Sequence, residues 1–120
     1  MATSSIRYGK RNVFVNDSQL GDWIKAMTET FDDLNAQNID IEWLLLECDQ
    51  WCEIYENFPP GLKDIELDEV LFDDNRKEIF IDLLKKVKRK VGNKDYNLEV
   101  AKDISSKLLF NLFEINQNDK

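Results

Sequence analysis

Residues 40–58, DIEWLLLECDQWCEIYENF, decide the fold that the sequence predicts. At 3.6 residues per turn, the apolar side chains of this stretch cover an arc of about 200°, so a helix here buries most of its circumference. Asp40 is suited to cap the helix, which we expect over residues 40–57, and the run from Phe58 to Gly61, with two prolines, ends it. So broad an apolar arc predicts the central helix of a bundle, contacted from two or more sides.

Three further stretches place apolar residues at three- and four-residue steps, the spacing of amphipathic helices. We expect these helices over residues 18–36, 75–91 and 97–115, with a short helical turn around residues 66–72. The run 13–15 allows a short extended segment before the first helix. The predicted fold class is all-α, a small bundle of four to five helices. We expect one domain over residues 1–120, with residues 1–11 and 116–120 flexible.

The composition excludes several classes of function. The 120 residues include no histidine, which removes Ser-His-Asp and Cys-His catalysis and His-ligated zinc. A net charge of −8 argues against a direct nucleic-acid or membrane partner, and no apolar run is long enough to cross a bilayer. Cys48 and Cys52 are expected to be reduced core thiols of a cytoplasmic protein. No cofactor is expected.

The charge is unevenly distributed along the chain. Residues 17–74 carry a net charge of −15, whereas residues 1–16 carry +3 and residues 75–94 carry +6. Concentrating so much charge of one sign costs stability through self-repulsion. Two explanations stay open: the acidic half pairs internally with the basic run Lys85–Lys90, or it forms a surface complementary to a basic partner.

Four carboxylates of the 40–57 helix share an arc of about 60° at 100° per residue, beside aromatic and aliphatic side chains. Apolar anchors surrounded by charge are what a tight protein interface requires. Trp51 and Tyr55 lie mid-arc and are expected in the core, whereas residues bordering the stripe are expected to contact a partner. The expected partner-binding residues are Glu42, Trp43, Leu46, Asp49, Glu53, Ile54 and Glu56.

Carboxylate pairs three residues apart offer an enzymatic alternative, because such pairs on packed helices can hold Mg²⁺. The pairs are Glu29–Asp32, Glu53–Glu56 and Glu66–Glu69. They are similar to the ExxE and ExxD motifs of the all-α nucleotide pyrophosphohydrolases, but the ExxD pair comes before the ExxE pairs here, the reverse of that family's order. We therefore favour a binding protein over an enzyme and assign no catalytic or metal-ligating residue.

An acidic, histidine-free helical chain of this size, with aromatics beside a carboxylate stripe, resembles the bacterial immunity proteins. These proteins neutralise bacteriocin or contact-dependent inhibition toxins, often basic nucleases. The resemblance implies a tight one-to-one complex with a basic protein, in which carboxylates occupy the phosphate-binding surface of the nuclease. We expect the free protein to be a monomer or weak dimer. A phage nucleic-acid mimic of the anti-CRISPR or anti-restriction type would use the same surface and is the alternative.

Overall fold

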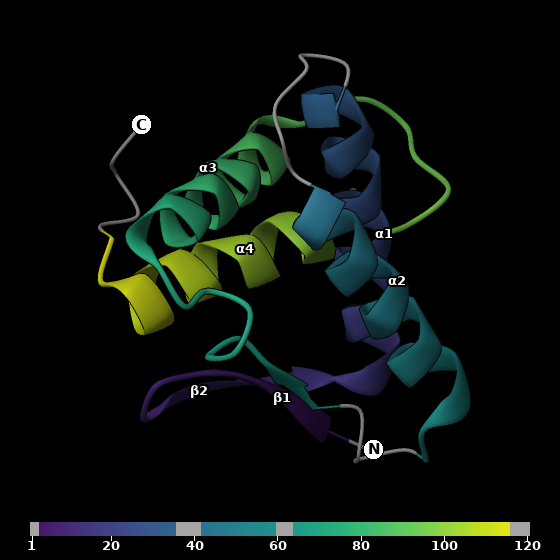
Figure 1. The fold of residues 1–120 in the computed structure, drawn as a ribbon. Helices are drawn as coiled ribbons and strands as arrows, with labels where there is room; N and C mark the ends of the chain where they lie inside the picture. The colour runs from purple at the N-terminus through teal and green to yellow at the C-terminus, as the bar shows by residue number, and fades with distance from the viewer. Residues whose placement is uncertain (1–2, 36–41, 60–63, 116–120) are drawn as a thin grey trace.

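The computed structural model describes residues 3–35, 42–59 and 64–115, and within them the fold is mixed α/β (Figure 1). Four helices lie on one side of a three-stranded sheet. The expected all-α fold class is therefore wrong, because the sheet is part of the core. The elements are β1 (Thr3–Tyr8), β2 (Arg11–Asn16), α1 (Asp17–Asn35), α2 (Glu42–Asn57), β3 (Ile65–Glu66), α3 (Asp74–Arg89) and α4 (Leu98–Phe113).

The sheet has the strand order β2-β1-β3, with β1 antiparallel to β2 and parallel to β3. A two-residue turn joins β1 to β2, and its first residue, Gly9, has a φ of +62°, as a type II′ hairpin turn requires. On the other side of β1, the Ser5 N–H donates to the Asp64 carboxylate at 2.8 Å, and the Leu67 N–H donates to the Arg7 carbonyl at 2.8 Å. The first strand of the chain is thus the central strand of the sheet.

Part of the segment 1–11, which we expected to be flexible, forms strand β1 and the start of β2. Ile6 of β1 is fully buried, and Val13 and Val15 of β2 are buried beside it under the helices. These alternating side chains form the inner face of the sheet, as a half-buried strand requires. The other expected flexible segment, 116–120, and the expected cap Asp40 lie outside the described residues.

The helices agree closely with the predicted ones, with ends that differ by one or two residues among those described. Asn97 caps α4, accepting a hydrogen bond from the Val100 N–H at 3.2 Å. The expected turn around residues 66–72 is present as a hydrogen bond from the Leu71 N–H to the Leu67 carbonyl at 2.8 Å. The expected helix over residues 75–91 includes Val91, but this residue lies beyond the end of α3 and is 78% exposed.

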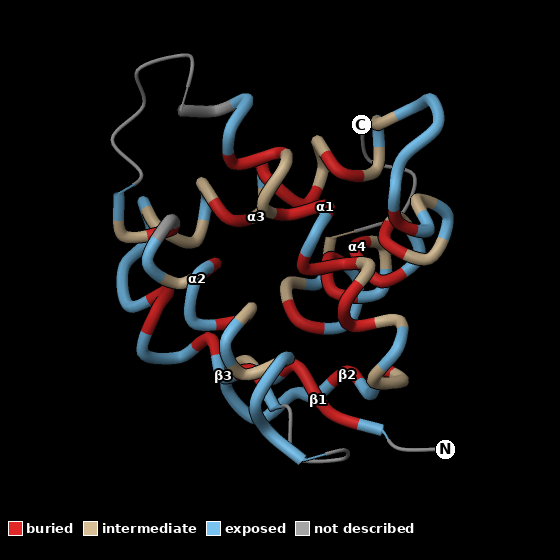
Figure 2. Tube along the Cα trace, turned by 90° about the vertical axis from the view of Figure 1, so that its right-hand side faces the viewer, coloured by how far each residue is buried: buried red, intermediate tan, exposed pale blue. Residues whose placement is uncertain are grey.

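Helix α1 occupies the central position that we expected for α2. It packs against α2, α3, α4 and β2, and its apolar face is buried along its length (Figure 2). Helix α2 packs mainly on α1, so it lies at the side of the molecule with one face open to solvent. The broad apolar arc of α2 reflects additional side-chain contacts to α3 and exposed apolar residues, not burial on all sides.

A continuous series of aromatic rings links five elements through the core. Trp23 of α1 stacks on Trp51 of α2 with ring centroids 5.4 Å apart, and Trp51 meets the edge of Phe80 of α3 at 6.2 Å. Phe80 continues to Phe113 of α4 at 5.9 Å, and Phe113 to Tyr8 of β1 at 5.1 Å. Because each ring comes from a different element, this series fixes the outer helix α2 to the rest of the fold.

Candidate partner-binding surface

The outward side of α2 carries the four carboxylates that we expected to contact a partner. Glu42, Asp49, Glu53 and Glu56 are all exposed, and we call these four residues the acidic face. Helix α2 contains no lysine or arginine, so no basic side chain of its own offsets this charge. Leu46 lies beside the acidic face and is 60% exposed, which is high for a leucine. The face therefore combines negative charge with an accessible apolar side chain.

Within the parts of the chain that the structure describes, no carboxylate of the acidic face makes an ion pair. The carboxylates of α1 differ in this respect. Glu29 lies 2.7 Å from Lys90 Nζ and 2.9 Å from Lys94 Nζ, and Lys90 also lies 3.6 Å from Asp33. The hydrogen bonds from Lys90 and Lys94 lower the pKa of Glu29 to about 2.

Internal pairing with the basic helix therefore accounts for acidic residues of α1 and not for the acidic face. Lys90, the last residue of the run Lys85–Lys90, reaches across to α1. Lys86 of the same run pairs with Asp82 on its own helix at 3.9 Å. Of the two explanations of the charge distribution, internal pairing is thus observed for α1.

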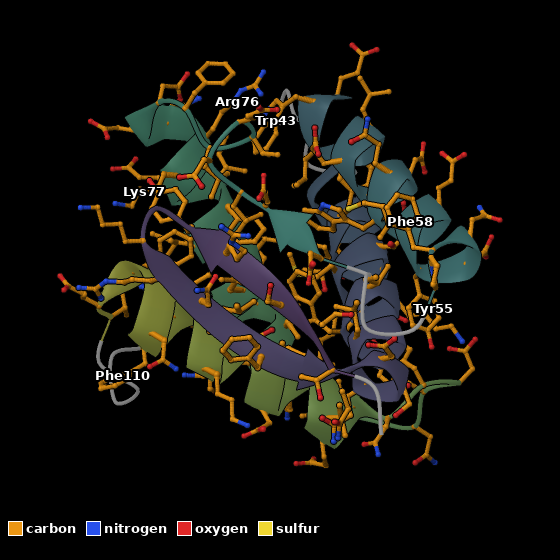
Figure 3. The ribbon with its side chains drawn as sticks, turned by 90° about the horizontal axis from the view of Figure 1, so that it is seen from below. Trp43, Tyr55, Phe58, Arg76, Lys77 and Phe110 are labelled. Atoms are coloured by element: carbon orange, nitrogen blue, oxygen red, sulfur yellow. The ribbon has the colours of Figure 1, made fainter. Side chains whose placement is uncertain are left out.

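An arginine between two aromatic rings lies at the N-terminal end of α2. The Arg76 guanidinium is 4.6 Å from the ring centroid of Trp43 and 4.3 Å from that of Phe72, and Figure 3 shows Trp43 and Arg76 next to each other. Phe72 is 65% exposed. Partial burial raises the pKa of Glu47 on the adjoining turn, against the opposing charge of Arg76. This cluster extends the surface from α2 onto α3.

A shallow groove of about 370 Å³ lies at the opposite end of α2, lined by Gln50, Glu53, Ile54, Asn57 and Phe58. Phe58 follows the helix, is 49% exposed and points outward (Figure 3). Ile54 is half-buried at the base of the same region. Ile54 and Phe58 of this groove give the acidic face apolar neighbours at this end, as Trp43 and Phe72 do at the other.

The seven residues predicted for partner binding all belong to α2, and the structure places them on its outward side. Five are exposed, while Trp43 and Ile54 are half-buried at the border of the face. Trp51 is 2% exposed, which confirms its predicted place in the core. Phe72, Arg76 and Phe58 were not predicted as part of this surface. Phe72 precedes α3 and Arg76 lies in its first turn, so both join the surface through tertiary contacts alone.

The carboxylate pairs that suggested a magnesium enzyme lie on different elements. Glu29 is bound to two lysines and Glu66 lies 3.5 Å from Arg7. Among the described residues, no three histidine, cysteine or acidic side chains converge as metal ligands would. Cys48 is buried and Cys52 is half-buried, both as free thiols, and burial raises the pKa of Cys48 to about 12.

In the described part of the chain, every helix is too short or too polar to cross a membrane. No protein-family model, curated protein or solved structure matches the chain. The functional conclusion therefore rests on the geometry of α2 and its surroundings.

Proposed function

We propose that this protein is a binding protein that neutralises a basic protein, and that the acidic face of α2 is its contact surface. The class of partner that the face fits best is a nuclease toxin, as in the immunity proteins that the sequence resembles. The protein would act in the cytoplasm, where its free cysteines stay reduced. In this role the carboxylates occupy positions where the nuclease otherwise holds phosphates.

The observation that supports this proposal is the contrast between the two acidic helices. Lysines reach Glu29 and Asp33 of α1, whereas the carboxylates of the acidic face have no ion pair within the described residues. Four unpaired negative charges on one helix face cost stability through mutual repulsion. A basic partner removes that cost on binding, so the repulsion in the free protein becomes affinity in the complex.

The apolar residues around the acidic face suit the rest of a tight interface. Leu46 stands exposed beside the carboxylates, with Phe72 at one end of the face and Phe58 at the other. Long-range attraction between the carboxylates and a basic surface speeds association, and it weakens as salt screens it. The apolar anchors then slow dissociation, because their burial is lost only when the complex separates.

A capture experiment with matched charge variants tests the proposal. The face variant carries Glu42→Gln, Asp49→Asn, Glu53→Gln and Glu56→Gln, and the control variant carries Asp32→Asn, Glu78→Gln, Asp82→Asn and Asp95→Asn. Both lose the same charge, but the control substitutions lie outside α2. Tagged forms of both variants and of the unmodified protein are used to capture partners from the native host.

We expect the unmodified protein and the control variant to retain one basic protein that the face variant loses. The nuclease activity of that protein should fall when stoichiometric unmodified protein is added back. Equal retention by the face variant would refute the role of the acidic face. If the captured protein is instead a DNA-binding defence protein without toxin activity, the chain that captured it acts as a nucleic-acid mimic.

A further inference from the structure

The groove at the C-terminal end of α2 combines hydrogen-bond acceptors with an apolar wall. It is formed by the last turns of the helix and the residue that follows them, and it is lined by Gln50, Glu53, Ile54, Asn57 and Phe58. Because Glu53 also belongs to the acidic face, the groove adjoins that face directly. Its volume of about 370 Å³ has room for one long side chain of a partner.

The polar side chains of the groove leave acceptors open in the free protein. The Asn57 side-chain N–H donates to the Glu53 backbone carbonyl at 3.1 Å, so this amide keeps its Oδ1 as an acceptor. The Glu53 carboxylate is exposed and makes no ion pair within the described residues. Among those residues, no lysine or arginine lines the groove. A ligand that fits the groove therefore brings donors and positive charge.

Ile54 and Phe58 supply the apolar wall. Ile54 is half-buried, and its carbonyl accepts from the Phe58 N–H at 3.0 Å, which holds Phe58 against the last turn of the helix. The Phe58 side chain is 49% exposed and lies at the end of α2, on the outside of the molecule (Figure 3). A half-exposed phenyl ring near a carboxylate attracts both a cation and the apolar stem that carries it.

We propose that this groove binds the side chain of one arginine of the partner, with its guanidinium between the Glu53 carboxylate and the Phe58 ring. A guanidinium carries five N–H donors and no acceptor, so it matches a groove whose open polar atoms accept. The carboxylate takes two of these donors side by side, and Asn57 Oδ1 takes another. The inference rests on the proposed function, because it names the group of the basic partner that the surface recognises.

A lysine side chain fits the same groove less well. Its ammonium is a compact, strongly hydrated charge that neither stacks flat on a ring nor presents a fixed fork to a carboxylate. A guanidinium is weakly hydrated, and its plane can lie on the Phe58 ring while its edge reaches Glu53. The groove thus gives the surface a preference between two basic side chains that long-range attraction does not distinguish.

Titration of the full chain with blocked single amino acids tests the site without any partner. The probes are Nα-acetyl-arginine methylamide, its lysine counterpart and its citrulline counterpart, which has the shape of arginine without the charge. We expect the arginine probe, at millimolar concentration, to shift the backbone amide NMR signals of residues 50–58 saturably. The lysine probe should bind at least about twofold more weakly, and the citrulline probe should give no saturable shift.

Two substitutions in the groove should weaken binding of the arginine probe. Phe58→Leu keeps an apolar side chain but removes the ring, and Glu53→Gln removes the charge. Each should raise the dissociation constant of the probe roughly two- to fivefold. The controls, Phe72→Leu and Glu42→Gln, make the same changes outside the groove and should leave the constant unchanged. All four side chains are exposed, and the amide spectra report whether each variant remains folded.

Three results would overturn the proposal: no saturable shift at residues 50–58, equal binding of the arginine and lysine probes, or equal effects of the groove and control substitutions. The probe titration does not depend on the capture experiment. If the proposed function fails, the face variant retains whatever the unmodified protein captures, while the arginine probe still binds in the groove. If the groove proposal fails, the probe shows no preference, while the face variant still loses the partner.

Discussion

Gly21 of α1 lies directly against the ring of Tyr55 of α2. A Cβ atom at position 21 would be 2.5 Å from Tyr55 Cζ and 2.6 Å from its Oη, well inside van der Waals contact. The lack of a side chain at Gly21 therefore makes room for the end of the Tyr55 ring of α2 against the central helix.

Gly21→Ala is expected to lower the free energy of unfolding by about 1–2 kcal/mol, although alanine is the better helix former. The reason is that the methyl group forces the ring of Tyr55 out of its position. Urea denaturation measures the change, with Tyr55→Leu and the double variant completing a cycle. The double variant should recover part of the loss, and strictly additive effects would show that the contact is not responsible.

The ion pairs of Glu29 predict a pH dependence of stability. Hydrogen bonds from Lys90 and Lys94 lower the pKa of this carboxyl from 4.5 to about 2. Because the folded-state pKa is the lower one, the stabilisation is present above pH 5 and is lost as the pH falls toward 2. Glu29→Gln should cost about 1 kcal/mol at pH 7, a modest value because the carboxyl is partly exposed.

Denaturation of the unmodified protein and Glu29→Gln across this pH range measures the difference. The two stability curves should converge between pH 5 and pH 2. Glu99→Gln, on the exposed start of α4, serves as the control. A constant difference at all pH values would mean that the substitution acts through packing and not through charge.

Ser105 of α4 offers a stabilising substitution. Its side-chain hydroxyl is buried, and within the described chain it has no hydrogen-bond partner. Ser105→Ala should raise the free energy of unfolding by about 0.5–1 kcal/mol, because it removes an unsatisfied polar group and adds helix propensity. Thermal and urea denaturation both report this change.

Thr30 provides the comparison, since it is equally buried but donates to the Ala26 carbonyl at 2.8 Å. Thr30→Val removes a satisfied hydroxyl and should bring no gain in stability. An equal gain in the free energy of unfolding from both substitutions would mean that apolar burial in general, and not the removal of an unsatisfied hydroxyl, is responsible.

Leu46 should act as an apolar anchor of the partner complex. Leu46→Ala is expected to raise the dissociation rate of the captured partner roughly tenfold while leaving association nearly unchanged. The free energy of unfolding of Leu46→Ala should differ from that of the unmodified protein by less than about 0.5 kcal/mol, because the Leu46 side chain is mostly exposed in the free protein. Surface plasmon resonance separates the two rates.

Val91→Ala is the matched control for Leu46, because Val91 is an exposed aliphatic residue in the loop after α3. It should change neither rate. If Leu46→Ala dissociates as slowly as this control, the partner does not contact that part of α2.

The helices could be predicted because their apolar residues recur at the helical period, which tertiary contacts did not override. In α3, for example, Phe80, Leu83, Leu84 and Val87 are buried at the predicted three- and four-residue steps. The strands show a weaker periodic pattern of apolar residues in the sequence than the helices do. In β1, Ser4 and Ser5 are buried next to Ile6, so the strand lacks the clean alternation of apolar and polar residues.

Strand β3 could not be predicted, because its two residues, Ile65 and Glu66, are too few to show any period. The candidate partner-binding surface was also predicted only in part, because some of its residues are brought together by tertiary contacts. Residues of α2 share a face through helical geometry alone, which the sequence encodes locally. The contribution of Phe72 and Arg76 depends on how α3 docks near α2, and no local pattern encodes that docking.

The position of β1 in the middle of the sheet has a consequence for the order of folding. During synthesis β1, β2 and α1 emerge first, yet Ile6 cannot meet Ile65 until α2 has also been made. Closing so long a loop costs chain entropy, so this pairing is expected to form late. A nascent chain that ends before β3 therefore holds α2 by its contacts with α1 alone. The contact of Trp51 with Phe80 of α3, which also follows β3 in the chain, thus joins α2 to the rest of the fold only after the sheet can be completed.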